Sequence, residues 1–181
     1  VGTMIDFGLS VAYYYVSIFK DKRLPRSPQY LNQYAIGRIR DSLANGENSA
    51  WVNLFAPVEL VAAMDIDPLF MEAYSSFMAG FFIEDLLVDA AETQGLSNTL
   101  CSFHKTFLGA NELNIVKKPR FMMTTSMICD GNIPTFKYLA KKQGVPPYVI
   151  DVPYSYSQEG VCYVKKQLVE LAHELEECFS K

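Results

Sequence analysis

The chain has 181 residues, half of them hydrophobic, and its 16 basic and 20 acidic residues give a net charge of −4. A chain of this length can bury one sizeable core, so we expect one domain with a helical extension. The sequence contains neither a basic stripe nor a long run of like charges, and this pattern argues against a nucleic-acid partner.

The first residues indicate two helices. Residues 3–20 are apolar and are predicted to form one helix, and residues 29–48 are predicted to form an amphipathic second helix. Asn45-Gly46 is a suitable C-cap for the second helix. We therefore assign residues 1–48 to an N-terminal helical extension and residues 49–181 to an α/β lobe.

Apolar runs and helical patterns alternate through the rest of the chain. Strands are predicted at 49–57, 68–75, 119–128 and 146–155, and helices at 57–66, 80–95, 97–110, 130–144 and 159–181. Pro57 can occupy the first position of its helix. Gly95 and Gly144 are expected to end the helices before them. This order predicts an α/β fold, a parallel four-stranded sheet flanked by helices in the manner of a Rossmann or flavodoxin-like lobe.

The cysteine pattern bears on the compartment. Four cysteines, at positions 101, 129, 162 and 178, form neither a CxxC pair nor a dense disulfide framework. We expect free or metal-ligating thiols in the reducing cytosol, so the predicted localisation is cytoplasmic. The apolar segment 4–19 is shorter than a bilayer span and carries Asp6, and it lacks the pattern of a signal peptide, so we expect no membrane partner. Because the first residue is Val1, the sequence is compatible with a piece of a longer chain.

Candidate site residues follow the ends of the predicted strands. Ligands of open parallel sheets bind beyond the carboxyl ends of the strands. Pro57–Glu59 follows the first strand, Cys129-Asp130 the third, and residues 151–154 the fourth. Cys129 also precedes a helix, whose free N–H groups and dipole favour a thiolate. Cys101 has a similar setting, in or near the first turn of a helix that Ser97, Asn98 or Thr99 could cap.

Each candidate has a structural alternative. Cys101 and Cys129 could be small buried hydrophobic residues rather than metal or redox thiols. Glu59 would be stabilised by the helix dipole without any function. His104 lies one turn after Cys101 and could share its site, or it could be an exposed histidine. We interpret Cys162 and Cys178 as packing residues and His173 as solvated, and the run Tyr13–Tyr15 as either an interface or ordinary helix packing.

Three longer strings resemble a known family. They are WVNLFAPVELVAAMDIDPLFMEAYS (51–75), LCSFHKTFLGA (100–110) and TTSMICDGNIPTFKYLAKKQGVPPYVIDVPY (124–154). Together they resemble the 2-hydroxyacyl-CoA dehydratase D-component family, which also contains the benzoyl-CoA reductase subunits. The resemblance rests on the order of a Cys-Ser-aromatic element, a Cys-Asp before a helix, and an Ile-Asp-Val-Pro strand end.

The resemblance implies a fold and a cofactor. Subunits of this family have two similar α/β lobes, and this chain resembles the first lobe alone. A [4Fe-4S] cluster is bound by three cysteines, of which two match Cys101 and Cys129. The third belongs to the second lobe, outside these residues. Glu59, in the family's Pro-x-Glu element, would face the substrate region and is the candidate catalytic residue.

The resemblance also implies a reaction and partners. The chain would be an iron–sulfur subunit, or its N-terminal lobe, of a lyase that eliminates water from a 2-hydroxyacyl-CoA thioester by radical chemistry. A separate ATP-dependent iron–sulfur activator would supply one electron and convert the thioester to a ketyl radical anion. A second dehydratase subunit, or the missing second lobe, would complete the site. The isolated chain is expected to be inactive.

Other interpretations stay open at this stage. The chain could belong to a benzoyl-CoA-reductase-like or double-cubane-type reductase. It could also be an inactive truncated lobe that acts as an assembly module. Neither the acyl-CoA, nor the oligomeric state, nor the presence of a flavin beside the cluster can be read from these residues.

Overall fold

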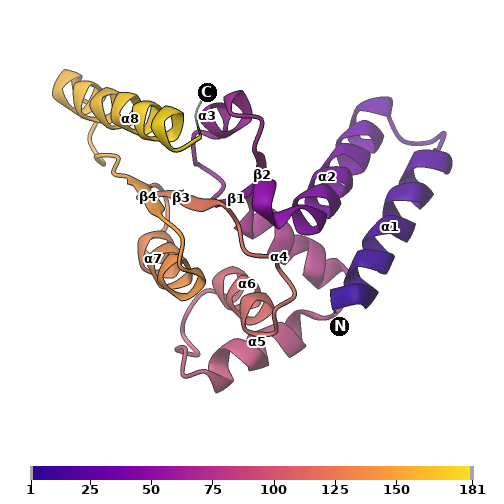
Figure 1. Cartoon of the computed structure of the whole chain (residues 1–181). Helices are drawn as coiled ribbons and strands as arrows, with labels where there is room; N and C mark the ends of the chain where they lie inside the picture. Colours follow the sequence, from indigo (N-terminus) through magenta and orange to yellow (C-terminus); the bar gives the residue numbers. More distant parts are fainter. Residues whose placement is uncertain (1, 180–181) are drawn as a thin grey trace.

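The computed structural model describes the backbone of residues 2–179 and the side chains of residues 7–178. The helices are α1 (Gly2–Ile18), α2 (Arg26–Ala44), α3 (Val58–Ala63), α4 (Met71–Gly80), α5 (Glu84–Thr93), α6 (Ser102–Glu112), α7 (Asn132–Gln143) and α8 (Gln158–Phe179), with a short 3-10 helix at Gly46–Asn48. The strands are β1 (Ser49–Val52), β2 (Asp67–Phe70), β3 (Phe121–Thr125) and β4 (Pro147–Ile150). Figure 1 shows the sheet between two layers of helices.

The four strands form one parallel sheet in the order β2-β1-β3-β4. In this register Trp51 of β1 lies opposite Leu69 of β2 and Met122 of β3. The predicted fold class, a parallel four-stranded sheet flanked by helices, is therefore confirmed. Because all strands run the same way, the loops that follow them emerge at one edge of the sheet.

Alternate residues of each strand enter two separate cores, as the two-residue period of a strand requires. Trp51 and Met122 join a large cluster with residues of α2, α4, α5, α6 and α7. Ala50, Val52 and Phe121 face the opposite side, where α3 and α8 complete a smaller cluster. The unbroken apolar sequence of the strands reflects this burial on both faces.

One predicted strand is largely wrong. The strand expected at 68–75 ends at Phe70, and helix α4 begins at Met71. Met71, Tyr74 and Met78 are buried together on one face of this helix, at the spacing of an α-helix. Burial against α6 and the sheet favours the helix over the strand that the apolar run suggested.

Several helix ends differ from expectation by a few residues. Pro57 is the N-cap of α3 rather than its first helical residue. Gly144 ends α7 in the left-handed conformation, with φ of 62°, as the sequence predicts. Gly95 follows α5 with φ of 85° and serves the same purpose.

Helices α1 and α2 form a hairpin beside the sheet (Figure 1). Tyr13 packs inward, with the Arg40 guanidinium 4.2 Å from its ring centre. Tyr14 and Tyr15 are each 61% exposed, so the tyrosine run is divided between packing and open surface. Leu9 of α1 reaches the larger core, and the boundary after residue 48 stays a prediction. Within the described residues, no helix is both long and apolar enough to cross a membrane.

Candidate functional site

The loops at the carboxyl edge of the sheet are joined by hydrogen bonds that are buried or partly buried. Asn53, which follows β1 and is fully buried, donates through Nδ2 to Thr125 Oγ1 and accepts from the Thr125 N–H, each at 3.2 Å. Ser126 accepts from the Val152 N–H at 2.8 Å and donates to the Val152 carbonyl at 3.3 Å. These bonds fix the loop after β3 between the loops after β1 and β4.

Cys129 lies in the loop between β3 and α7. The loop turns sharply, because Ile128 has a φ of 70° and the Cys129 N–H donates to the Met127 carbonyl at 2.8 Å. A side-chain carbon added at Gly131 would lie 3.3 Å from Cys129 Sγ, so glycine leaves room for the sulfur. The Cys129 side chain is half-buried, and α7 begins three residues later.

His104 lies against the Cys129 sulfur. Its Nε2 is 3.6 Å from Cys129 Sγ, and its Nδ1 is 2.9 Å from the Thr135 hydroxyl. The alternative that His104 is an exposed histidine is wrong, since its side chain is only 3% exposed. Burial lowers the pKa of the His104 imidazole, which favours the neutral ring.

Cys101 is the N-cap residue of α6. The prediction that Ser97, Asn98 or Thr99 caps this helix is therefore wrong. The Cys101 carbonyl accepts the N–H of Lys105 at 3.0 Å, and the thiol is exposed. His104 follows on the same helix, so α6 carries both Cys101 and the neighbour of Cys129. A thiolate at Cys101 would lie at the positive end of the α6 dipole.

The segment after β4 borders the same edge. The Tyr154 hydroxyl donates to Asp130 at 3.2 Å, next to Cys129 in sequence. The Asp151 N–H donates to Gln167 of α8 at 2.8 Å, which ties the segment to that helix.

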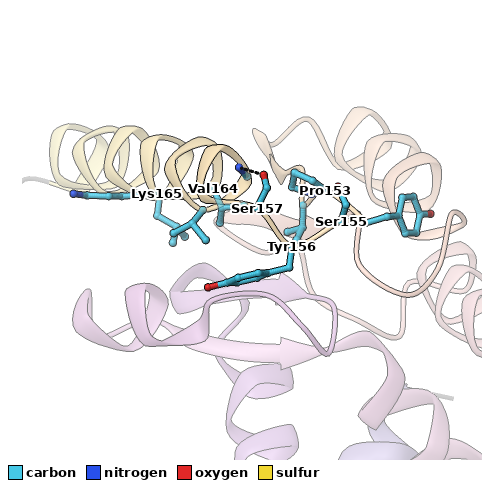
Figure 2. Close-up of a pocket in the computed structure, with 11 residues that line it drawn as sticks. Pro153, Ser155, Tyr156, Ser157, Val164 and Lys165 are labelled. Carbon is cyan, nitrogen blue, oxygen red and sulfur yellow. Dashed lines mark hydrogen bonds between the residues drawn. The ribbon is translucent and has the colours of Figure 1, made fainter.

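A pocket of about 460 Å³ lies between this segment and α8. Val152, Pro153, Val164 and Leu168 contribute apolar walls, and Lys165 adds a positive charge. Figure 2 shows Tyr156 and Val164 reaching the same space from the loop and from α8.

Two glutamates border the loop after β1. Glu59 is exposed in the first turn of α3. Glu72, which the sequence analysis missed, lies in the first turn of α4, directly after β2. Burial raises the pKa of Glu72, although backbone N–H groups of Glu72 and Leu54 that bond to the carboxylate oppose this rise. Recognition of the helix start at Met71 would have placed Glu72 at the sheet edge.

Comparison with known proteins gives the family. Residues 53–181 match the model of the family described as "2-hydroxyglutaryl-CoA dehydratase, D-component". The matched segment is well over half of the chain and contains Glu59, Cys101 and Cys129. The chain belongs to this family.

Two curated relatives are subunits of dehydratases. The chain is 23% identical over 174 residues to the (R)-phenyllactyl-CoA dehydratase alpha subunit of Clostridium sporogenes, an alignment that covers 90% of this chain and 43% of the relative. It is 24% identical over 140 residues to the (R)-2-hydroxyisocaproyl-CoA dehydratase alpha subunit of Clostridioides difficile, covering 72% of this chain and 34% of the relative. The chain therefore spans less than half the length of either relative.

The residues of this D-component chain fit an iron–sulfur cluster in part. Thiolates are the usual ligands of such clusters, and Cys129 and Cys101 offer two of them, one beside Gly131 and one exposed on a helix end. No group of three or more His, Cys, Asp or Glu side chains in the described part of the chain is arranged to hold a metal ion. The chemistry of the two thiols suits a cluster, but this ligand set is incomplete.

Glu72 gives a pH-dependent prediction. Because its pKa is raised in the folded chain, its contribution to stability is greatest at acid pH and is lost as the pH rises through the folded-state pKa. Replacing Glu72 with Gln removes the charge and keeps an oxygen for the two N–H groups. We expect Glu72→Gln to gain stability over the wild type as the pH rises above the ordinary carboxyl pKa of about 4.3, and the gain to level off once the pH has passed the folded-state pKa.

Urea unfolding of both proteins at a series of pH values measures the effect. Near pH 4 the Glu72 side chain of the wild type is largely neutral, like the Gln side chain of the variant. The stability difference measured at that pH is therefore the internal control. A stability difference that stays constant with pH would contradict the assignment.

Proposed function

We propose that the chain supplies the first lobe of an iron–sulfur subunit in a 2-hydroxyacyl-CoA dehydratase. The observation that carries this proposal is the placement of the two thiols. The loop before α7 holds Cys129 against His104, and His104 stands one turn after Cys101 on α6. Membership of the D-component family and the names of the two relatives support the same reaction class.

Cys101 and Cys129 would hold two irons of a [4Fe-4S] cluster, with the remaining ligands outside this chain. Such a cluster, when bound, would transfer the single electron that radical elimination of water requires. Cys101 is the N-cap residue of α6 and Cys129 lies three residues before α7, so a cluster on these thiols would lie near the N-terminal ends of two helices. The exposed thiol of Cys101 is open to a ligand that approaches from outside the chain.

The substrate in this proposal is an acyl-CoA thioester. The pocket between α8 and the segment that joins β4 to it offers apolar walls for an acyl or pantetheine arm. Lys165 offers a cation for a phosphate. Glu59 and Glu72 stand beside the loop after β1 at the same sheet edge. Glu72, whose pKa burial raises, is better suited to hold a proton than an exposed carboxylate, whereas Glu59 is the family-based candidate for contact with the substrate.

The proposal includes partners. A second dehydratase subunit or further lobe would complete the ligand set, and an ATP-dependent activator would deliver the electron. The complex would work in the reducing cytoplasm of a cell with anaerobic metabolism. The α1–α2 hairpin exposes Phe7, Tyr14 and Ile18 on α1, with exposed fractions of 72%, 61% and 69%. An apolar surface of this kind suits burial against another protein surface.

Because both relatives are named as dehydratase subunits, a dehydratase is favoured over the reductase alternatives.

Reconstitution with iron and sulfide under anaerobic conditions tests the cluster assignment. We expect the wild-type chain to gain visible absorption and bound iron. Cys101→Ser and Cys129→Ser should each lower the bound iron, because each removes one of the two thiolates that are available as ligands.

Cys162→Ser and Cys178→Ser are matched controls, since both cysteines are exposed on α8 and away from α6 and α7 in sequence. They should leave the iron content unchanged. Equal iron content in the wild type, Cys101→Ser and Cys129→Ser would exclude these residues as ligands.

A further inference from the structure

The contact between His104 and Cys129 joins two elements that are far apart in sequence. His104 belongs to α6 and Cys129 to the loop before α7, 25 residues later. Gly131 borders this contact, and a side-chain carbon there would lie 3.3 Å from Cys129 Sγ, a tight contact, and 3.5 Å from His104 Nε2. The imidazole is almost completely buried, so protein groups rather than water surround it.

The hydrogen-bond partners of the ring indicate which nitrogen carries the proton. The Thr135 hydroxyl is 2.9 Å from Nδ1, and Thr135 is 5% exposed. The structure records no second partner for this hydroxyl among residues 7–178. If Nδ1 carried the proton and donated to Thr135, the hydroxyl hydrogen would be buried without an acceptor, which is costly. If the hydroxyl donates to Nδ1 instead, the proton of the neutral ring is on Nε2.

An Nε2–H at this position points to sulfur. The Nε2 to Sγ separation of 3.6 Å is a hydrogen-bond contact for a sulfur acceptor. A thiolate accepts such a bond more strongly than a neutral thiol, since bonds to charged acceptors are the stronger ones. The hydrogen-bonded series Thr135–His104–Cys129 therefore directs an N–H donor at the sulfur.

We propose that His104 is a positioning residue that donates its Nε2–H to the Cys129 sulfur, with its ring oriented by the Thr135 hydroxyl. The role of this bond toward a cluster rests on the proposed function, in which Cys129 is a ligand. A hydrogen bond to a ligating sulfur withdraws electron density from it and raises the reduction potential of the cluster. His104 would thus orient the ligand and adjust the energy at which the site accepts an electron.

The hydrogen bond itself can be tested without iron. In proton–nitrogen correlation spectra of the ¹⁵N-labelled chain, we expect a slowly exchanging proton on His104 Nε2. His173, the other histidine, is exposed and is the internal reference for a ring in fast exchange with water. Cys129→Ala should shift or abolish the His104 signal, and Cys101→Ala should leave it in place.

A proton located on Nδ1, or an Nε2–H signal that Cys129→Ala leaves unchanged, would overturn the proposal. Thr135→Val removes the hydroxyl at nearly constant volume and should speed the exchange of the Nε2 proton. An exchange rate equal to that of the wild type would show that Thr135 does not orient the ring. Thermal unfolding of each variant separates these effects from a loss of fold.

The consequence for the cluster is tested on the reconstituted chain. His104→Phe keeps a planar ring without a donor, and we expect a lower midpoint potential than in the wild type. His104→Gln retains a side-chain N–H and should restore part of the shift. Equal potentials in the wild type and His104→Phe would overturn the tuning role. If Cys101→Ser and Cys129→Ser hold as much iron as the wild type, the proposed function fails, and the spectra of the iron-free chain still decide whether His104 donates to Cys129.

Discussion

Gly109→Ala is expected to destabilise the chain by about 3 kcal/mol or more, the upper range for overpacking a core. Gly109 lies in α6 at its crossing with α5. A side-chain carbon there would overlap the Leu87 carbonyl oxygen and lie 2.5 Å from the Leu87 carbonyl carbon. Because the obstacle is backbone, no rotamer change can relieve the overlap, and α5 and α6 must separate.

The same change should disturb the candidate site, because α6 carries Cys101 and His104. Thermal unfolding should show a melting temperature lower by roughly 6–12 °C, given the size of the chain, and iron loading should fall. Gly8→Ala in α1 is the matched control, since nothing lies within 4 Å of a carbon added there. Alanine at that helical position should be neutral or stabilising by up to about 1 kcal/mol. A Gly109→Ala protein as stable as the wild type would show that the two helices do not pack as described.

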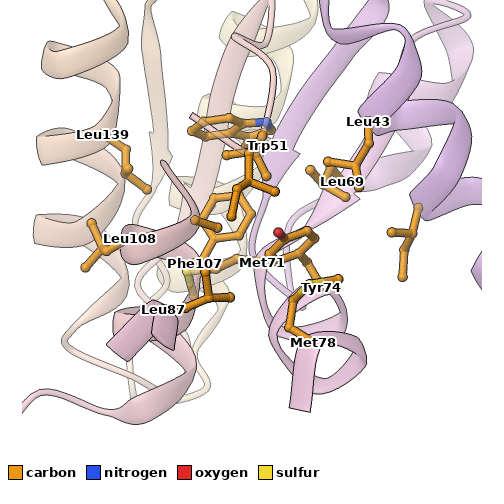
Figure 3. Packing of buried hydrophobic residues seen from close by; sticks show 14 of the residues in the cluster. Leu43, Trp51, Leu69, Met71, Tyr74, Met78, Leu87, Phe107, Leu108 and Leu139 are labelled. Carbon is orange, nitrogen blue, oxygen red and sulfur yellow. The ribbon is translucent and has the colours of Figure 1, made fainter. Parts of the chain in front are cut away.

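Phe107→Ala is expected to cost about 3–5 kcal/mol, the usual range for removing a buried aromatic ring. Phe107 is fully buried, and its ring meets Trp51 edge-on at 5.0 Å and Tyr74 edge-on at 5.4 Å between centres. Figure 3 shows these three rings together at the middle of the larger core, contributed by α6, β1 and α4. Truncation leaves a cavity where three elements meet and removes two favourable ring pairs.

Phe103→Ala is the matched control for this prediction. Phe103 lies one turn earlier on α6 and is 42% exposed, so its truncation should cost less than about 1.5 kcal/mol. Denaturant unfolding of the two variants gives both values directly. Similar losses for Phe107→Ala and Phe103→Ala would mean that the aromatic cluster does not anchor α6 to the sheet.

The sequence was sufficient for features that depend on short-range physics. Apolar runs predicted the strands, and Gly144 predicted the end of α7 because few other residues adopt a left-handed φ readily. The alternation of strands and helices predicted a parallel sheet with helices on both faces. The same order placed Glu59, Cys129 and the segment after β4 at the carboxyl ends of strands, where the structure has them.

Local patterns failed where an apolar segment suited two structures. Residues 68–75 are apolar enough for a strand, yet Met71, Tyr74 and Met78 gain more burial as one face of a helix. That error also concealed Glu72, whose position at the sheet edge depends on α4 beginning at Met71. Ser97, Asn98 or Thr99 was expected to cap the helix that begins near Cys101, but Cys101 itself is the N-cap residue. Boundaries of this kind depend on packing that the local sequence does not encode.

The sequence by itself determined the family resemblance, the sheet and the two candidate thiols. Only the tertiary structure decided which groups touch those thiols. His104 is 25 residues from Cys129 and 31 from Thr135 in the chain, and all three meet because α6 and α7 pack on the same face of the sheet. A histidine three residues after a cysteine does not reveal whether its ring faces water or sulfur. That choice depends on packing between distant segments, including the space that Gly131 leaves beside the sulfur.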